Sequence, residues 1–164
     1  MADTFPRQWA RTQRLTLGEP RNVAVSADGS RVLFARSRAG DDRVNCLWQL
    51  DVASGAEQLL ADPLVLLGAA DDAALPAAER ARRERMREGA SGVTTFSTDG
   101  SSRQCAFALS GRLFVADAGA ETTAAREVSV DGPVFDPRPD PSGRRIAYVS
   151  GNTLRVTDLD GNSR

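Results

Sequence analysis

The chain of 164 residues has no histidine, no lysine and only two cysteines. Without histidine it cannot build a Ser–His–Asp or Cys–His nucleophilic centre, and zinc sites that require imidazole are excluded. Two thiols are too few for a four-thiolate metal site, so we expect neither a metal nor another cofactor. All 21 cationic residues are arginines. We attribute this to the coding bias of a GC-rich genome and not, in the first place, to recognition of a ligand.

A strong net charge and long apolar segments are also missing. The formal net charge is −1, so no long-range field attracts nucleic acid or an anionic membrane. Residues 1–17, which we treat as an N-terminal leader, are polar and lack the apolar core of a secretory signal. The longest apolar run, residues 63–70, is less than half of the ~20 residues that cross a bilayer. These features predict a soluble, cytoplasmic protein without nucleic-acid or membrane partners.

The two cysteines, Cys46 and Cys105, are 59 residues apart, a spacing that matches no metal-binding motif. One disulfide between them is compatible with an oxidising compartment. Two buried thiols in a reduced cytosol are the alternative that we favour.

A pattern of strand, tight turn, strand, connector and strand recurs three times along the chain. Its turns are Asp28-Gly29, Asp99-Gly100 and Ser142-Gly143. Asp-Gly suits a two-residue hairpin turn, because both residues tolerate a positive φ. An aspartate closes the third strand of each unit, and we expect these carboxylates to accept hydrogen bonds from turn amides and not to bind calcium. They are Asp51, Asp117 and Asp158.

The turn glycines are 71 and then 43 residues apart, and the difference corresponds to a segment from about residue 61 to residue 88 that lacks strand character. A period of ~40–45 residues with three or four short strands is typical of a β-propeller blade. A β-sandwich with recurring hairpins is the alternative, and the equal spacing favours the propeller. We therefore predict an all-β partial propeller of about three blades over residues 18–164, with a helical insert at about 61–89. Trp48 is expected to pack between blades.

Three blades do not close a propeller, which needs ~4–8 of them. An open array leaves strand edges and apolar faces uncovered. The last residues, Asp160-Gly161-Asn162-Ser163-Arg164, form a turn at which another strand is due. We therefore expect this chain to be the beginning of a longer protein.

Residues 76–89 of the insert have the composition of a short helix, with Pro76 at its start and Gly89 at its end. Oppositely charged residues lie three or four positions apart, which stabilises a helix slightly. A charged helix on the surface is one interpretation. A helix that presents arginine side chains to a carbonyl or carboxylate ligand is another, because guanidinium has several donors in one plane. Phosphate binding is disfavoured by the three glutamates in the segment.

Several of these motifs are similar to the N-terminal propeller of dipeptidyl peptidase IV-type enzymes, which belong to the prolyl oligopeptidase family of serine peptidases. The resemblance is closest to the bacterial and the dipeptidyl peptidase 8/9-like branch. It rests on the arginine-rich run at residues 79–88, on Gly-Val-Thr-Thr-Phe at 92–96 and on Leu-Ser-Gly-Arg-Leu-Phe-Val at 109–115, with further similarity at 132–139 and 142–149.

The resemblance implies a propeller of about eight blades, followed by a C-terminal α/β-hydrolase domain that carries the catalytic Ser, Asp and His. Such hydrolases act in proteolysis, releasing dipeptides with proline or alanine in the second position, and the parent enzyme is expected to be a homo-oligomer. Arginines of the helix contact the carbonyl groups of the peptide substrate, and this role carries over to Arg83, Arg85 and Arg87. The family's amine-binding Glu-Glu pair lies beyond this chain, and the Gly-x-Ser-x-Gly motif is absent.

The predicted function is therefore that of an N-terminal propeller fragment of a serine dipeptidyl peptidase. It shapes and gates the substrate chamber, contains no catalytic residue and is inactive alone. A non-enzymatic interaction module that associates with itself or with a partner is the alternative. A nucleic-acid binder that uses Arg80–Arg87 is a third hypothesis, which the net charge of −1 disfavours.

Overall fold

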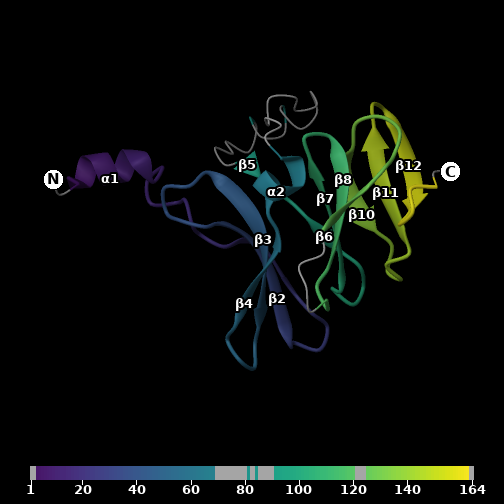
Figure 1. The fold of residues 1–164 in the computed structure, drawn as a ribbon, viewed down its shortest axis with the longest axis horizontal. Coiled ribbons are helices and arrows are strands. Elements are labelled where there is room, and N and C mark those ends of the chain that lie inside the picture. Colours follow the sequence, from purple (N-terminus) through teal and green to yellow (C-terminus); the bar gives the residue numbers. More distant parts are fainter. Residues whose placement is uncertain (1–2, 69–80, 82–83, 85–90, 121–124, 163–164) are drawn as a thin grey trace.

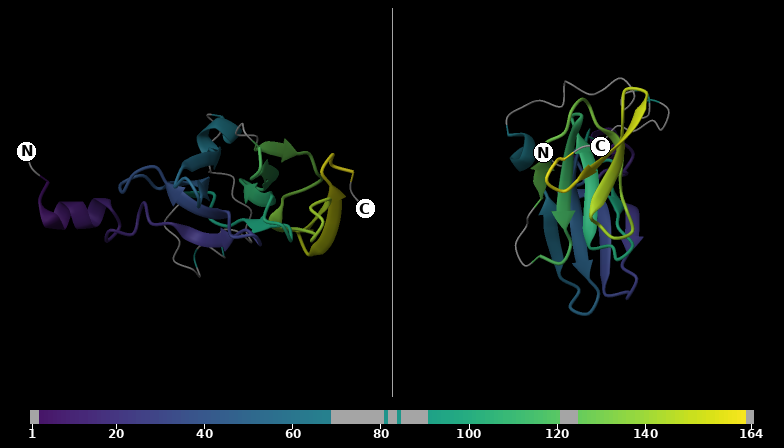
Figure 2. Two further views of the ribbon diagram at one scale, coloured as in Figure 1. Left: turned by 90° about the horizontal axis from the view of Figure 1, so that it is seen from below. Right: turned by 90° about the vertical axis from the view of Figure 1, so that its right-hand side faces the viewer.

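The computed structural model describes residues 3–68, 81, 84, 91–120 and 125–162. Three antiparallel sheets stand side by side in the order of the sequence (Figures 1 and 2). We call them blades 1, 2 and 3. Blade 1 consists of β1 (Arg21–Val25), β2 (Arg31–Ser37), β3 (Val44–Asp51) and β4 (Glu57–Ala61), with β5 (Ser91–Gly92) added in parallel to β3.

The strands of the other two blades follow the same simple antiparallel order. Blade 2 consists of β6 (Ser97–Thr98), β7 (Gln104–Leu109), β8 (Arg112–Asp117) and β9 (Arg126–Val128). Blade 3 consists of β10 (Phe135–Pro139), β11 (Arg145–Ser150) and β12 (Thr153–Asp158). The prediction of an all-β partial propeller with three repeats is confirmed.

Strand register shows that the three blades are structural repeats. In each blade, the first residue of the second strand pairs with the last residue of the third strand. These pairs are Arg31↔Asp51, Gln104↔Asp117 and Arg145↔Asp158. These pairs set the equivalences between blades that are used below. As predicted, the aspartate of each pair accepts turn amides: Asp51 from Ser54 N, Asp117 from Gly119 N and Asp158 from Asp160 N, at 2.8, 2.8 and 3.0 Å.

The first hairpin of each blade differs from the two-residue turn expected from the sequence. Ser26, Asp99 and Asp140 begin the turns, and four residues separate each of them from its hydrogen-bonded partner. The left-handed position is occupied by Gly29, Ser102 and Gly143, with φ of 71°, 54° and 69°. Gly100 therefore does not correspond to Gly29, and the spacing of the turn glycines was misassigned by two residues in blade 2.

Side chains close these longer turns and make up for the missing glycine. The Oδ1 atom of Asp99 accepts from the amides of Arg103 and Gln104 at 2.8 and 3.1 Å. Asp140 accepts from Arg144 N in the same way at 2.9 Å. The first residue of the turn thus stabilises the loop by capping its amides.

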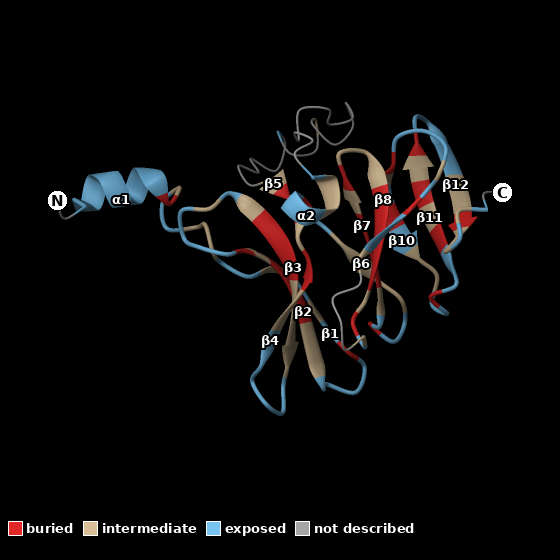
Figure 3. Cartoon of the chain, viewed as in Figure 1, coloured by how far each residue is buried: buried red, intermediate tan, exposed pale blue. Residues whose placement is uncertain are grey.

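Two buried clusters hold the blades together, one on each face of blade 2. In Figure 3 buried residues are coloured red in the strands of all three blades. The cluster between blades 1 and 2 includes Leu33, Leu47, Phe107 and Phe114. The cluster between blades 2 and 3 includes Leu113, Val115, Ile146 and Tyr148. Each such side chain, fully buried, contributes about 1.5–3 kcal/mol of transfer free energy, so these contacts between sheets are the main source of stability.

Cys46 and Cys105 are both free and buried, so the prediction of two buried thiols is confirmed. Burial raises the pKa of Cys46 to about 11 and that of Cys105 to about 12. Trp48 lies on the face of blade 1 turned away from blade 2, and its Nε1 donates to the Arg36 carbonyl at 2.9 Å. Its packing between blades stays a prediction, because no described blade covers that face.

Within residues 1–17, the helix α1 (Phe5–Arg11) projects away from the sheets and buries none of its residues. The rings of Phe5 and Trp9 lie 5.7 Å apart on its exposed surface. A second short helix, α2 (Pro63–Leu67), follows β4 and is capped by the Asp62 side chain. In the described part of the chain, no helix has the length and apolarity needed to span a membrane.

We predict that acid destabilises the fold through its turn aspartates. Hydrogen bonds from Ser26 and Ser30 hold the pKa of Asp28 below its ordinary value of 3.8, and those from Ser54 do the same for Asp51. Because these pKa values are lower in the folded state, the stabilisation is present above pH 3.8 and is lost as pH falls. Urea unfolding midpoints should therefore drop between pH 5 and pH 3.

The double variant Asp28→Asn, Asp51→Asn tests the assignment. Its amide oxygens still accept the same turn donors but cannot be protonated in this range. Its unfolding midpoint should therefore depend less on pH than that of the wild type. An unchanged pH dependence would assign the acid sensitivity to other carboxylates.

Candidate functional site

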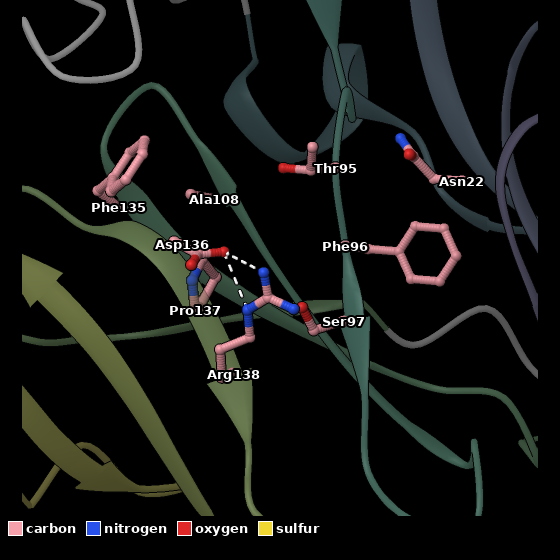
Figure 4. A pocket seen from close by; sticks show the side chains of 9 residues that line it. All are labelled: Asn22, Thr95, Phe96, Ser97, Ala108, Phe135, Asp136, Pro137 and Arg138. Atoms are coloured by element: carbon pink, nitrogen blue, oxygen red, sulfur yellow. Dashed lines mark hydrogen bonds and ion pairs between the residues drawn. The ribbon is translucent and has the colours of Figure 1, made fainter. Parts of the chain in front are cut away.

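The innermost strands of the three blades, β1, β6 and β10, converge on a cavity of about 410 Å³. We call it the axial cavity, because the innermost strands of a propeller surround its central channel. Figure 4 shows that all three blades contribute to its wall. Its lining residues are Asn22, Thr95, Phe96, Ser97, Ala108, Phe135, Asp136, Pro137 and Arg138.

Three polar residues of the cavity occupy the same position in the repeat. Asn22, Thr95 and Asp136 each lie four residues before the residue that begins the first hairpin turn of their blade. Asn22 and Asp136 have left-handed backbones, with φ of 51° and 48°, a conformation that Asn and Asp tolerate better than other non-glycine residues. The register of β1 shifts between Arg21 and Ala24, and that of β10 shifts between Phe135 and Arg138. Bulges of this kind redirect side chains and are common beside functional sites.

The polar groups of the cavity differ in how far they are already paired. The Asn22 amide donates to the Thr94 carbonyl and so ties blade 1 to the segment that enters blade 2. Oδ1 of Asp136 pairs with Nε and Nη2 of Arg138 at 3.0 and 2.9 Å, as the dashed lines in Figure 4 mark. The hydroxyls of Thr95 and Ser97 have no hydrogen-bond partner among the described residues.

This combination of groups suits the binding of a polar ligand. A carboxylate, a guanidinium, an amide and two hydroxyls supply both donors and acceptors, while Phe96 and Phe135 supply apolar surface. Among the described residues, no group of three or more Asp, Glu, Cys or His side chains could hold a metal ion. An extended polar ligand with its own amides and carbonyls, such as a peptide, has the chemistry that this wall can satisfy.

The predicted substrate-binding residues Arg83, Arg85 and Arg87 lie outside the described residues. The chain around them leaves blade 1 after α2 and rejoins it at β5, which pairs with Val44 and Asn45 at the start of β3. The starts of β1 and β3 lie at the same end of blade 1, since β2 runs antiparallel to both. The arginine-rich segment therefore rejoins the sheet at the end where Asn22 lies.

Gly92 permits this junction. Its φ is 72°, and a Cβ atom there would collide with the carbonyl oxygen of Asn45. Two residues on, Thr94 accepts the hydrogen bond from Asn22, and Thr95 then enters the cavity wall. The end of the arginine-rich segment and the wall of the axial cavity are thus joined by a short, well-anchored stretch of chain.

Sequence reasoning missed Asn22, Thr95 and Asp136. The shared position becomes visible only when the turns are aligned by their hydrogen bonds. Aligning Gly29, Gly100 and Gly143 instead places Val93, and not Thr95, at the position of Asn22 and Asp136.

Comparison with known proteins supports the fold alone. No family model matches the chain. TolB from Acinetobacter baumannii is 12% identical over 87% of this chain, with a TM-score of 0.53. The β-propeller domain of Cps50 (Swd1) from Myceliophteria thermophila is 13% identical over 90% of it, with a TM-score of 0.53. The dihydro-heme d1 dehydrogenase NirN is 23% identical over 89%, with a TM-score of 0.52.

The chain spans 31% of TolB, 38% of the Cps50 domain and 27% of NirN. Together with the three repeated sheets, these similarities establish that it forms part of a β-propeller. At such low identities they concern its architecture and not its activity.

We predict that the backbone at Asp136 discriminates between valine and glycine. Both Asp136→Val and Asp136→Gly remove the ion pair with Arg138, so their difference isolates the cost of the positive φ. The valine variant should be less stable by about 1–2 kcal/mol in urea unfolding, because a β-branched residue is strained there.

The same pair of substitutions at Arg138 is the control. Arg138 lies in β10 without a positive φ, so Arg138→Val should be at least as stable as Arg138→Gly. Equal stability of the two Asp136 variants would mean that the left-handed conformation at this bulge is not imposed by the fold.

Proposed function

We propose that this chain forms the N-terminal propeller blades of a serine dipeptidyl peptidase and that it shapes and gates the substrate chamber for the release of N-terminal dipeptides. The catalytic Ser, Asp and His would come from a C-terminal α/β-hydrolase domain, since this chain has no histidine. One observation carries the proposal above the others. The axial cavity, with polar residues at the same position in three blades, lies beside the point where the arginine-rich segment rejoins the sheet.

The axial cavity would accept a peptide by satisfying its backbone. The hydroxyls of Thr95 and Ser97 can donate to carbonyl oxygens or accept from amides, and Phe96 offers apolar surface to a small side chain. An apolar wall with a few fixed polar groups is the usual composition of a ligand site. Selection would then depend on shape and hydrogen bonding along the peptide and not on a strong local charge.

The arginine-rich segment would supply the charged contacts. Arg83, Arg85 and Arg87 carry planar guanidinium groups, which can donate two hydrogen bonds to one carbonyl or carboxylate. Arg87 precedes Thr95 by eight residues, and an extended chain of that length reaches ~26–29 Å. The segment is therefore close enough in sequence to the cavity wall to contact a ligand bound there.

This chain covers only part of the solved propellers that it resembles, which supports a parent protein with more blades. The chain spans about a third of TolB, and a closed propeller requires ~4–8 blades. In this proposal the peptide substrate, the hydrolase domain and further copies of the parent enzyme are the partners, and no cofactor takes part.

The size of the natural product is the first test. An antibody raised against residues 1–164 should detect a protein of ~75–85 kDa in the source cells, the size of a full propeller with a hydrolase domain. A band at 17.5 kDa would contradict the proposal, because the catalytic residues would then be missing from the polypeptide.

Substitutions in the full-length protein then test the arginines. We predict that at least one of Arg83→Ala, Arg85→Ala and Arg87→Ala lowers kcat/KM ~10–100-fold on dipeptidyl substrates with proline or alanine in the second position. Arg144→Ala is the matched control, since Arg144 is exposed in a hairpin turn remote from the cavity wall. Unchanged kcat/KM in all three variants would remove the arginines from the substrate site.

A further inference from the structure

The two faces of blade 2 differ in composition, and each is buried against a neighbour. We call the face toward the next blade in the sequence the forward face and the opposite one the backward face. The forward face of blade 2 is aliphatic and contributes Ala106, Ala108, Leu113 and Val115 to the contact with blade 3. Its backward face contributes an aromatic pair, Phe107 and Phe114, to the contact with blade 1, with ring centroids 5.8 Å apart.

The forward face of blade 3 repeats this aliphatic pattern but has no described neighbour. Leu154 lies four residues before Asp158, just as Leu47 and Leu113 lie four residues before Asp51 and Asp117. Leu47 and Leu113 are 0% exposed in the two contacts between blades, whereas Leu154 is 71% exposed. Val149 is its cross-strand partner. The side chain that inserts into the next blade in two repeats is therefore present and uncovered in the third.

The backward face of blade 1 carries the complementary half. Phe34 and Trp48 form a cross-strand pair at the position of Phe107 and Phe114 in blade 2. On the same face, Val25 pairs with Val32 and is 58% exposed. The molecule thus presents an uncovered aliphatic forward face at one end. At the other end the backward face exposes Val25, whereas the Phe34 ring beneath Arg36 is only 4% exposed.

An arginine on the backward face does not prevent docking. Arg36 stacks on Phe34 and Trp48, with its guanidinium carbon 5.2 and 5.1 Å from the ring centroids. In blade 2, Arg112 stacks on Phe114 at 5.3 Å, although blade 1 is packed against that same ring. The pairs Arg36↔Cys46 in blade 1 and Leu109↔Arg112 in blade 2 occupy the same position in the repeat. The arginine lies on the second strand in blade 1 and on the third strand in blade 2. An arginine stacked on the ring is therefore compatible with a blade packed against the same face.

We propose that the chain binds a second copy of itself head to tail, the forward face of blade 3 docking on the backward face of blade 1 of the partner copy. The new contact repeats one that the chain already makes twice internally. Two copies would supply six blades, three from each, which lies within the range of closed propellers. Such heterologous contacts form a ring when the rotation closes. The inference concerns the 164-residue chain on its own. In the longer parent enzyme of the peptidase proposal, the next blade would take the place of the second copy on the forward face of blade 3.

Solution mass is the first measurement. The 164-residue chain should sediment at about 35 kDa, twice its 17.5 kDa, at micromolar concentration. Leu154→Asp should weaken association ~30-fold or more, because it places a charge at the centre of the contact. It should keep the wild-type circular dichroism, since Leu154 is exposed in the single chain. Val65→Asp is the matched control: Val65 is 76% exposed on α2, outside both faces, and its substitution should leave the dimer intact.

Mixing two variants tests the head-to-tail geometry. Val25→Asp damages the backward face and should also give a monomer. An equimolar mixture of the Leu154→Asp and Val25→Asp proteins retains one contact with both faces intact, so dimers should form again, more weakly than in the wild type because a closed pair has two contacts. Val25→Ser, a milder change, replaces Val25→Asp if the latter fails to fold.

The proposal has clear contrary outcomes. A wild-type chain that remains a monomer at all concentrations would overturn it and leave these faces to further blades of a longer polypeptide. A Leu154→Asp chain that still dimerises would overturn it as well. Failure of the mixture to restore dimers would contradict the head-to-tail arrangement, as would a Val25→Asp chain that dimerises alone, because like faces would then meet each other.

Discussion

The alternation of side chains along a β-strand is the constraint on which this structure depends. Successive residues of β7 and β8 are apolar, and because neighbours point to opposite sides, both faces of blade 2 must be covered. Blade 2 meets this requirement by standing between two other sheets. Blades 1 and 3 also carry apolar residues on both faces but have only one described neighbour each. Packing of sheet on sheet therefore both stabilises the array and leaves it incomplete at its two ends.

The same repetition creates the candidate site. Because the blades are structural repeats, equivalent positions of the three innermost strands face the axis at the same height along it. Asn22, Thr95 and Asp136 are polar at that height. Two of the three have left-handed backbones at register shifts. Strain of this kind persists only where the surrounding sheet imposes it, so the rigid contacts between blades are what allow the cavity wall to keep its shape.

The sequence was sufficient for the repeats and insufficient for the details that make the site. Apolar runs and the aspartates at 51, 117 and 158 predicted the blades correctly, because they depend on local patterns. The turn alignment was wrong in blade 2 because Ser102 adopts the conformation for which glycine is usual, and capping by Asp99 compensates. The axial residues were missed because their proximity arises only when three blades are packed. The arginine helix remains a prediction.

Completion of the ring and binding at the axis are thermodynamically linked. The described wall of the axial cavity comes from three blades, and a closed propeller surrounds its channel with more. A ligand that contacts the wall on both sides must therefore bind the closed assembly more tightly than the open array. Linkage is reciprocal. The factor by which closure of the ring raises the affinity for such a ligand is also the factor by which the bound ligand strengthens the contact at Leu154. This reasoning holds whether the remaining blades come from a second copy or from a longer polypeptide, because the uncovered faces and the incomplete wall belong to the same three sheets.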